Sequence, residues 1–259
     1  MAGALKSTTE GRTLVLTLSD PEHKNALGPD IYAAGVEAMY AAENNPDIRS
    51  VVITGEGPHF CAGGNLQRLQ ANRHQPAEVQ LQSLEGLHSW IDSIRTFPKP
   101  VIAAVEGAAA GAGFSLALAC DFLVAADTAF FVMAYSNIAL SPDGGASWSL
   151  SRALPRTLVA DILMRGERLR AQELQALGLV NRLAPAGEAL TSALALAEQL
   201  NAKAPNVMAS IKELINEAPG NTLSQQMARE RDLFVLNLHH VNGGEGIDAF
   251  LQKRPADYR

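Results

Sequence analysis

Short runs of apolar residues alternate with longer amphipathic stretches along the first half of the chain. The runs at 13–18, 50–57 and 99–107 are rich in Val, Ile, Leu and Ala and end near glycine, proline or acidic residues, which predicts strands. The stretches at 28–45 and 84–97 repeat apolar residues at helical spacing, which predicts helices. Strands that alternate with helices indicate an α/β fold.

The alternation continues to about residue 195, and the pattern then changes. The runs at 122–127 and 129–133 predict two more strands, and helical segments joined by short loops follow them. From about residue 205 the pattern is helical and more charged. We therefore expect two regions, an α/β core over residues 1–195 and a helical region over residues 196–259.

Composition and charge narrow the class of protein. The 259 residues are 47% hydrophobic and 19% charged with a net charge of −6, so a globular fold is expected and a nucleic-acid-binding face is not. Cys61 and Cys120 are too few for a disulfide framework, which favours a cytoplasmic protein. The N-terminal residues lack the pattern of a secretory signal. The long apolar stretch 101–120 contains Glu106 and several glycines, so no membrane span is expected.

Two glycine-rich turns share one design. "FCAGGNL" (60–66) and "AGAGFSL" (110–116) each follow a predicted strand and lead into a predicted helix. Small residues let the backbone approach a ligand closely, and the N–H groups at a helix start are unpaired. Two such turns facing one pocket would hold one oxyanion between two donors. Backbone geometry alone also explains a glycine at such a turn, and neither turn matches a nucleotide-binding fingerprint.

Several segments, in order and spacing, resemble the crotonase (enoyl-CoA hydratase/isomerase) superfamily over nearly the whole chain. They are "HKNAL" (23–27), "FCAGGNL" (60–66), "KPVIAAVEGAAAGAGFSLALACDFLVAAD" (99–127), "LSPDGG" (140–145), "AQELQALGLVNRL" (171–183) and "AFLQKR" (249–254). The resemblance implies a spiral of ββα units with an acyl-CoA site, and a C-terminal helical region that builds a homotrimer or a hexamer of paired trimers. It implies an acyl-CoA thioester as substrate, with coenzyme A as part of it and no metal or other cofactor.

The resemblance also assigns roles to individual residues. The backbone N–H groups of Ala62 and Ala112 are expected to polarise the thioester carbonyl, which is worth roughly 3 kcal/mol per donor in comparable oxyanion holes. Gly63, Gly64 and Gly111 would provide the close approach. The residues expected to lie along the CoA moiety are Lys24, Asn25, Ala26 and Leu27.

Three positions depart from the hydratases of that superfamily. Ser115 and Tyr135 stand where those enzymes carry their two glutamates, so a mechanism that activates water between two acids is not supported. Ser115 would orient a water but is a poor base at neutral pH. Asn65 replaces a more common aspartate, and we interpret it as the N-cap of the next helix, with a polar role near the thioester as the alternative.

One carboxylate remains in the right neighbourhood. Asp143 lies in "SPDGGASW" (141–148), which resembles the Pro-Asp-Gly-Gly turn of the ring-epoxide isomerases of phenylacetyl-CoA degradation and the Pro-Glu turn of Δ3,Δ2-enoyl-CoA isomerases. Pro-Asp-Gly is also a common turn sequence, so a structural aspartate is the alternative. We predict that Asp143 is the catalytic acid and base, with its proton affinity raised by an apolar pocket.

Other residues near these motifs support weaker predictions. Trp148 either walls an acyl pocket or belongs to the core, and Tyr135 either donates a hydrogen bond or fills space. Cys61 has no histidine evidently related to it, which argues against nucleophilic catalysis.

Three functions remain open at this point. The favoured one is proton transfer on an unsaturated acyl-CoA through an enolate, with Asp143 as the acid and base. The second is hydration of an enoyl-CoA, or hydrolysis of an oxepin-type CoA ester, with Asp143 acting alone on water. The third is acyl-CoA binding without turnover.

Overall fold

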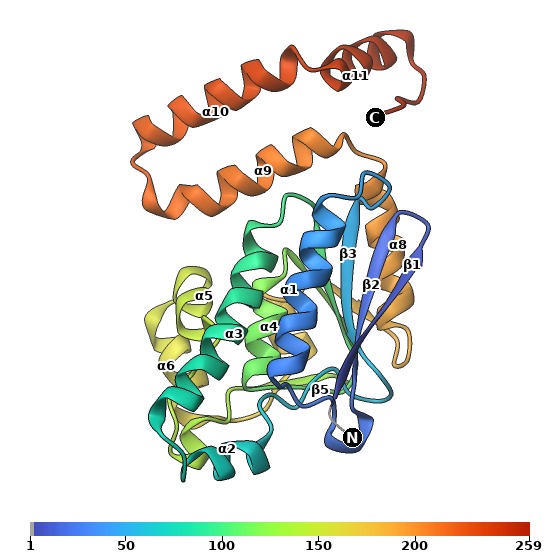
Figure 1. Cartoon of the computed structure of the whole chain (residues 1–259). Helices are drawn as coiled ribbons and strands as arrows, with labels where there is room; N and C mark the ends of the chain where they lie inside the picture. Colours follow the sequence, from blue (N-terminus) through green and yellow to red (C-terminus); the bar gives the residue numbers. More distant parts are fainter. Residues whose placement is uncertain (1–2) are drawn as a thin grey trace.

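The computed structural model describes residues 3–259 and is built around a six-stranded sheet (Figure 1). The strand order is β1 (Ala4–Glu10), β2 (Thr13–Ser19), β3 (Ser50–Gly55), β4 (Val101–Val105), β6 (Phe122–Ala126) and β9 (Arg182–Ala184). β1 pairs antiparallel with β2, and the other neighbours are parallel. The sequence pattern did not predict β1 because most side chains of this edge strand are exposed, so no apolar run marks it.

A smaller sheet lies beside the first and makes the fold a spiral. It contains β5 (Ala108–Ala110), β7 (Phe130–Val132) and β8 (Leu169–Arg170), and a parallel bridge between Cys61 and Ala109 adjoins it. After β4 the chain crosses to β5 and enters α4 (Ala112–Ala119). After β6 it crosses to β7, passes η2 (Ser136–Ile138) and enters α5 (Ala146–Ala153). The predicted spiral of ββα units is confirmed.

Helices cover both faces of the main sheet because its strands are apolar on both sides. Val51 and Ile53 of β3 pack in the cluster that includes α1 (Pro29–Glu43) and α3 (Ala77–Thr96). Val52, between them, packs with α8 (Ala189–Asn201) on the opposite face, as the alternation of side chains along a strand requires. Further short helices are α2 (Leu66–Asn72), α6 (Arg156–Arg165), α7 (Ala171–Ala176), η1 (Pro21–His23) and η3 (Ala218–Gly220).

The C-terminal region is helical, as predicted, but its boundary differs from the expected one. Residue 195 falls inside α8, whose Leu196 and Ala197 are buried against the main sheet. The helices that stand apart from the sheet are therefore α9 (Pro205–Glu217), α10 (Leu223–Leu238) and α11 (Val241–Gln252) (Figure 1). In the described part of the chain, no helix is both long and apolar enough to span a membrane.

Candidate active site

Both glycine turns and the Asp143 turn open onto one cavity of about 500 Å³. The first turn lies between β3 and α2, the second between β5 and α4, and the Asp143 turn lies before α5. Apolar side chains from α2, α3 and the segment after η2 line the rest of the cavity, among them Leu69, Leu84 and Leu140. The spiral thus brings together three turns that are far apart in the sequence.

The first turn offers a different backbone donor from the one predicted. The N–H of Ala62 donates to the Lys24 carbonyl at 2.9 Å, so it is not available to a ligand, and the prediction that Ala62 supplies a donor is wrong. Leu27 donates in turn to the Gly63 carbonyl at 2.8 Å. The N–H of Gly64, two residues later, makes no hydrogen bond within residues 3–259. Because Gly64 lines the cavity, it is the donor that this turn leaves open.

The second turn supplies another open donor beside the first. Gly111 has a φ of +51°, and its N–H donates to the Val132 carbonyl at 2.8 Å. Ala112 is the first residue of α4, and no acceptor for its N–H occurs within the described chain. A Cβ added to Gly63 would lie 3.3 Å from the Ala112 nitrogen, so the two turns are in close contact. Two unused N–H groups, those of Gly64 and Ala112, therefore border the same space.

Asp143 is the one carboxylate among the described residues that line this cavity. Its side chain accepts a hydrogen bond from the Tyr135 hydroxyl. Burial raises the pKa of Asp143, whereas the Tyr135 hydrogen bond and the nearby His88 act to lower it. The net direction is upward, which gives this carboxyl a stronger hold on a proton than an exposed aspartate has.

Tyr135 holds the Asp143 carboxylate from one side of the cavity. Its side chain is buried, with 8% of its surface exposed, and its hydroxyl would lie 3.6 Å from a Cβ added to Gly111. Burial and the neighbouring Asp143 raise the pKa of Tyr135, so the phenol stays protonated and acts as the donor. The pairing was missed in the sequence because η2 and a turn separate the two residues, and no regular spacing marks such a contact.

His88 was also missed. It lies on α3 one turn after Leu84, and both residues line the cavity. The signal was present in the sequence, because His88 follows Leu84 by one helical turn, but the stretch was used only to predict a helix.

Ser115 supports the Asp143 turn and does not line the cavity, which contradicts its predicted role in substrate binding. It is 1% exposed, and its hydroxyl donates to the main-chain carbonyl of Asp143 at 2.9 Å. Gly144 and Gly145 follow with φ values of +59° and +75°, a conformation that glycine adopts without strain. This hydroxyl therefore fixes the backbone from which the carboxylate projects.

Trp148 lies outside the catalytic cavity, so its predicted role in the acyl pocket is wrong. Two guanidinium groups lie over its ring, with the Cζ of Arg95 at 4.5 Å and that of Arg152 at 3.8 Å from the ring centre. These residues line a separate cleft beside Asp121. Trp148 lies on α5, one helical turn beyond Gly145, and is 41% exposed.

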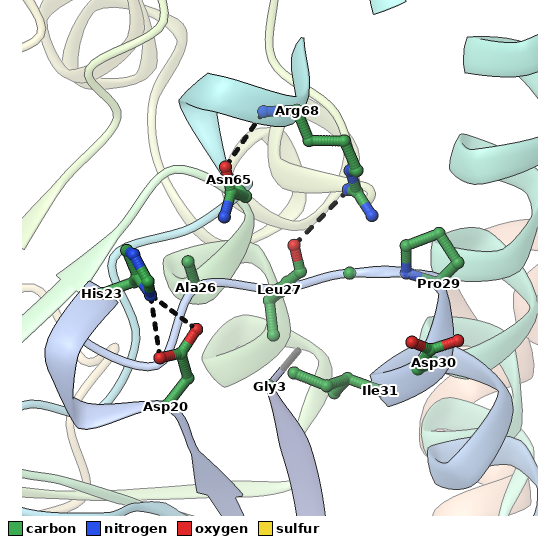
Figure 2. A pocket seen from close by; sticks show the side chains of 11 residues that line it. Gly3, Asp20, His23, Ala26, Leu27, Pro29, Asp30, Ile31, Asn65 and Arg68 are labelled. Carbon is green, nitrogen blue, oxygen red and sulfur yellow. Dashed lines mark hydrogen bonds and ion pairs between the residues drawn. The ribbon is translucent and has the colours of Figure 1, made fainter. Parts of the chain in front are cut away.

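The loop at 24–27 and Asn65 surround a second cavity, shown in Figure 2. Ala26, Leu27 and Asn65 line it, while Lys24 is exposed nearby. Asn65 caps α2, as predicted, because its side chain accepts the Arg68 N–H at 3.0 Å.

Asn25 has a structural role in that loop. It is fully buried, and its side chain bonds the main chain of Asp20, Glu56 and His59 at 2.7–2.9 Å. The Asn25 side chain is therefore used within the fold, and its predicted place along the CoA moiety stays a prediction.

Cys61, next to the first turn, is not an active thiol. It is fully buried, and desolvation raises its pKa to about 12. A thiol with that pKa is not ionised at neutral pH, so it cannot act as a thiolate nucleophile.

Comparison with known proteins places these features in a family. Residues 8–259 match the enoyl-CoA hydratase/isomerase family. The chain is 34% identical over 253 residues to the 1,2-epoxyphenylacetyl-CoA isomerase of Escherichia coli (strain K12), covering 97% of each chain. It is 34% identical over 250 residues to the 2,3-dehydroadipyl-CoA hydratase of the same strain, covering 96% of this chain and 95% of the relative. The crystal structure of an enoyl-CoA hydratase from Polaromonas sp. JS666 matches with a TM-score of 0.98 and 74% identity, covering 99% of this chain and 100% of that one.

Proposed function

The chain belongs to the enoyl-CoA hydratase/isomerase family, and from this premise we propose that it moves a proton on an unsaturated acyl-CoA through an enolate. The observation that carries the proposal is the composition of the cavity. One carboxylate, Asp143, faces a space bordered by two unused backbone donors, Gly64 and Ala112. One acid suffices for an isomerisation, because the same group removes and returns the proton.

The thioester carbonyl oxygen is expected to accept hydrogen bonds from the Gly64 and Ala112 N–H groups. Asp143 then takes a proton from the α or the γ carbon, and the electron pair of that C–H bond moves toward the carbonyl oxygen. The two donors stabilise the resulting enolate by roughly 3 kcal/mol each. Asp143 returns the proton to the other carbon, so the double bond shifts and no atom is gained or lost. This chemistry requires no metal and no redox cofactor.

Hydration is the second candidate, and the 74% identity to a protein named an enoyl-CoA hydratase favours it. In that case Asp143 would act on a water, without a second carboxylate to hold it. The cavity offers Tyr135 and His88 as the other polar groups near this acid. We rank this function second because the two-carboxylate site of the hydratases has no counterpart at Ser115 and Tyr135.

The experiment is turnover of 3-enoyl-CoA and 2-enoyl-CoA in D₂O. Isomerisation predicts conversion between the two, with deuterium at the carbon that receives the proton only to the extent that the proton on Asp143 exchanges with solvent before it is returned. Formation of 3-hydroxyacyl-CoA from 2-enoyl-CoA, without isomerisation, would favour hydration instead. CoA binding with no turnover of either substrate would contradict both reactions and favour a binding protein.

The donors can be tested separately from the acid. Gly64→Pro removes the proposed N–H and is expected to reduce kcat/KM by roughly 10²- to 10³-fold. Gly64→Ala is the matched control, because the nearest atom to an added Cβ is a Leu69 methyl at 3.8 Å and the N–H is kept. Equal activity of both variants would exclude Gly64 as a donor.

We also propose that the protein is a cytoplasmic homotrimer or hexamer assembled through the C-terminal helices. Large apolar side chains are exposed on α10 and α11, namely Phe234, Leu236, Val241, Phe250 and Leu251. Such side chains favour burial against another copy. Light scattering should give three or six times the monomer mass of 27.5 kDa, and a monomer would contradict the proposal.

A further inference from the structure

Arg68 lies where the catalytic cavity meets the cavity of Figure 2, and it lines both. It belongs to the first turn of α2, directly after the capped start at Asn65. Its side chain reaches back over the Leu27 carbonyl, to which one guanidinium nitrogen donates at 3.4 Å (Figure 2). The guanidinium therefore borders the loop at 24–27 on one side and the catalytic cavity on the other.

The guanidinium is poorly satisfied by the protein. Its Nε is buried and has no hydrogen-bond partner, and no carboxylate within residues 3–259 forms an ion pair with it. The contrast is Lys212, whose ammonium donates to Asp121 at 2.7 Å and to the Ile94 carbonyl at 2.9 Å. Lys212 is buried and paired, as a buried cation must be, whereas Arg68 is partly exposed and keeps one buried nitrogen, Nε, without a partner.

A tyrosine adds a second donor at the same place. Tyr32, on α1, is 4% exposed and lines the catalytic cavity beside Arg68. Burial raises the pKa of Tyr32, and the adjacent Arg68 opposes that rise. The phenol is therefore protonated at neutral pH and available as a donor. A guanidinium and a phenol that converge on one cavity suit a group with several acceptor oxygens and a negative charge.

We propose that Arg68, together with Tyr32, binds an anionic oxygen group of the bound acyl-CoA, an inference that rests on the proposed function. An acyl-CoA has two sources of such a group: the phosphates of CoA and, in some substrates, a carboxylate at the far end of the acyl group. Asp20 and Asp30 also line the cavity of Figure 2, and Asp20 is paired with His23 there at 2.9 Å. Asp143 is the carboxylate that lines the catalytic cavity near Arg68.

The test compares Arg68→Gln and Arg68→Lys with Arg73→Gln, an exposed arginine at the end of the same helix. Each variant is assayed with three thioesters of equal acyl length: an enoyl-CoA ending in a methyl group, an enoyl-CoA ending in a carboxylate, and the methyl-ended enoyl group on pantetheine. Arg68→Gln is expected to raise KM by roughly ten- to a hundredfold where the recognised anion is present. Arg68→Lys should retain part of the affinity because it keeps the charge but not the planar fork. Arg73→Gln should change nothing.

The pattern of losses identifies the source of the anion. A loss confined to the carboxylate-ended substrate assigns the acyl carboxylate. A loss with both CoA esters that disappears on pantetheine assigns a CoA phosphate. A KM within twofold of wild type for all three substrates would overturn the proposal.

A binding measurement separates this inference from the proposed function. If the wild type turned over none of the substrates, the proposed function would fail, and titration calorimetry with CoA and with the saturated carboxylate-ended acyl-CoA would still decide the role of Arg68. Weaker binding by Arg68→Gln than by Arg73→Gln would support an anion site, and equal affinity would overturn it.

Discussion

Two partly exposed aspartates, Asp143 and Asp121, show how surroundings give one residue type two roles. Asp121 accepts the Val101 N–H at 2.8 Å and the Lys212 ammonium at 2.7 Å, both at Oδ2, so it is held within the fold by a cation and a backbone donor. Asp143 has a neutral partner, Tyr135, and faces a cavity. Burial raises the pKa of both carboxyls, so the direction of the shift does not separate them. Their partners do, because a cation holds a carboxylate in its charged form while a phenol leaves it free to exchange a proton.

The largest expected effect is a loss of activity on substitution of Asp143, which separates this residue from Asp121. Asp143→Asn should reduce kcat by roughly 10²- to 10⁴-fold, because it removes the general acid and base while keeping the shape of the side chain. It should leave the free energy of unfolding at pH 7 unchanged or raised, since the folded state holds the ionised form of Asp143 less well than the unfolded state does. Activity assays and thermal melts on one preparation check both statements. Full activity of this variant would remove Asp143 from the mechanism.

The second-largest effect is expected at Asp121, where stability should fall and activity should stay. Asp121→Ala should lower the free energy of unfolding by about 3 kcal/mol, because it leaves the Lys212 ammonium buried without its partner. The double variant Asp121→Ala/Lys212→Met should recover part of that loss. Activity per folded molecule should stay near wild type at temperatures well below the melt. A loss of activity without a loss of stability would show that the two sites are coupled.

Tyr135→Phe is expected to change how the activity depends on pH. The Tyr135 hydroxyl acts to lower the pKa of Asp143, so its removal should raise that pKa further. The reaction needs the ionised carboxylate as base, so the acidic limb of the rate profile should move to higher pH, with activity recovered above the new pKa. Asp121→Ala should leave the position of this limb unchanged. A profile that falls uniformly without moving would show that Tyr135 does not act through Asp143.

The smallest effect concerns the support of the Asp143 turn. Ser115→Ala removes the hydroxyl that donates to the Asp143 carbonyl and should cost about 1 kcal/mol of stability. Activity should fall by only a few fold, because the carboxylate and its Tyr135 partner remain. A decrease as large as that of Asp143→Asn would mean that Ser115 itself takes part in the reaction.

The sequence pattern predicted most of the strands and helices, whereas the spiral was expected from the family resemblance. Runs such as 51–53 and 101–105 are apolar throughout, and strands covered by helices on both faces require this. β1 escaped prediction because its pairing with β2 is made by backbone groups, which leave no trace in the side-chain pattern. The expected boundary at 195 falls inside α8, because the contacts of that helix with the sheet depend on tertiary packing that the sequence pattern does not show.

The candidate site was predicted at the level of motifs and less well at the level of atoms. Asp143 and the two glycine turns could be recognised from order and spacing. Which N–H is open could not be, because the Lys24 carbonyl that accepts from Ala62 lies far away in the sequence. The direction of Trp148 and the contact between Tyr135 and Asp143 likewise depend on turn geometry that residue types alone do not specify.

The two hydrogen bonds between the loop at 24–27 and the first glycine turn have a mechanical consequence. Ala62 donates to Lys24 and Leu27 donates to Gly63, so one hydrogen bond at each end of the loop holds it against the turn. A ligand seated against the loop is thereby held at a fixed distance from the Gly64 N–H. The loop therefore sets the position of the reacting carbonyl. The entropy cost of that alignment is met when the protein folds, before the substrate binds.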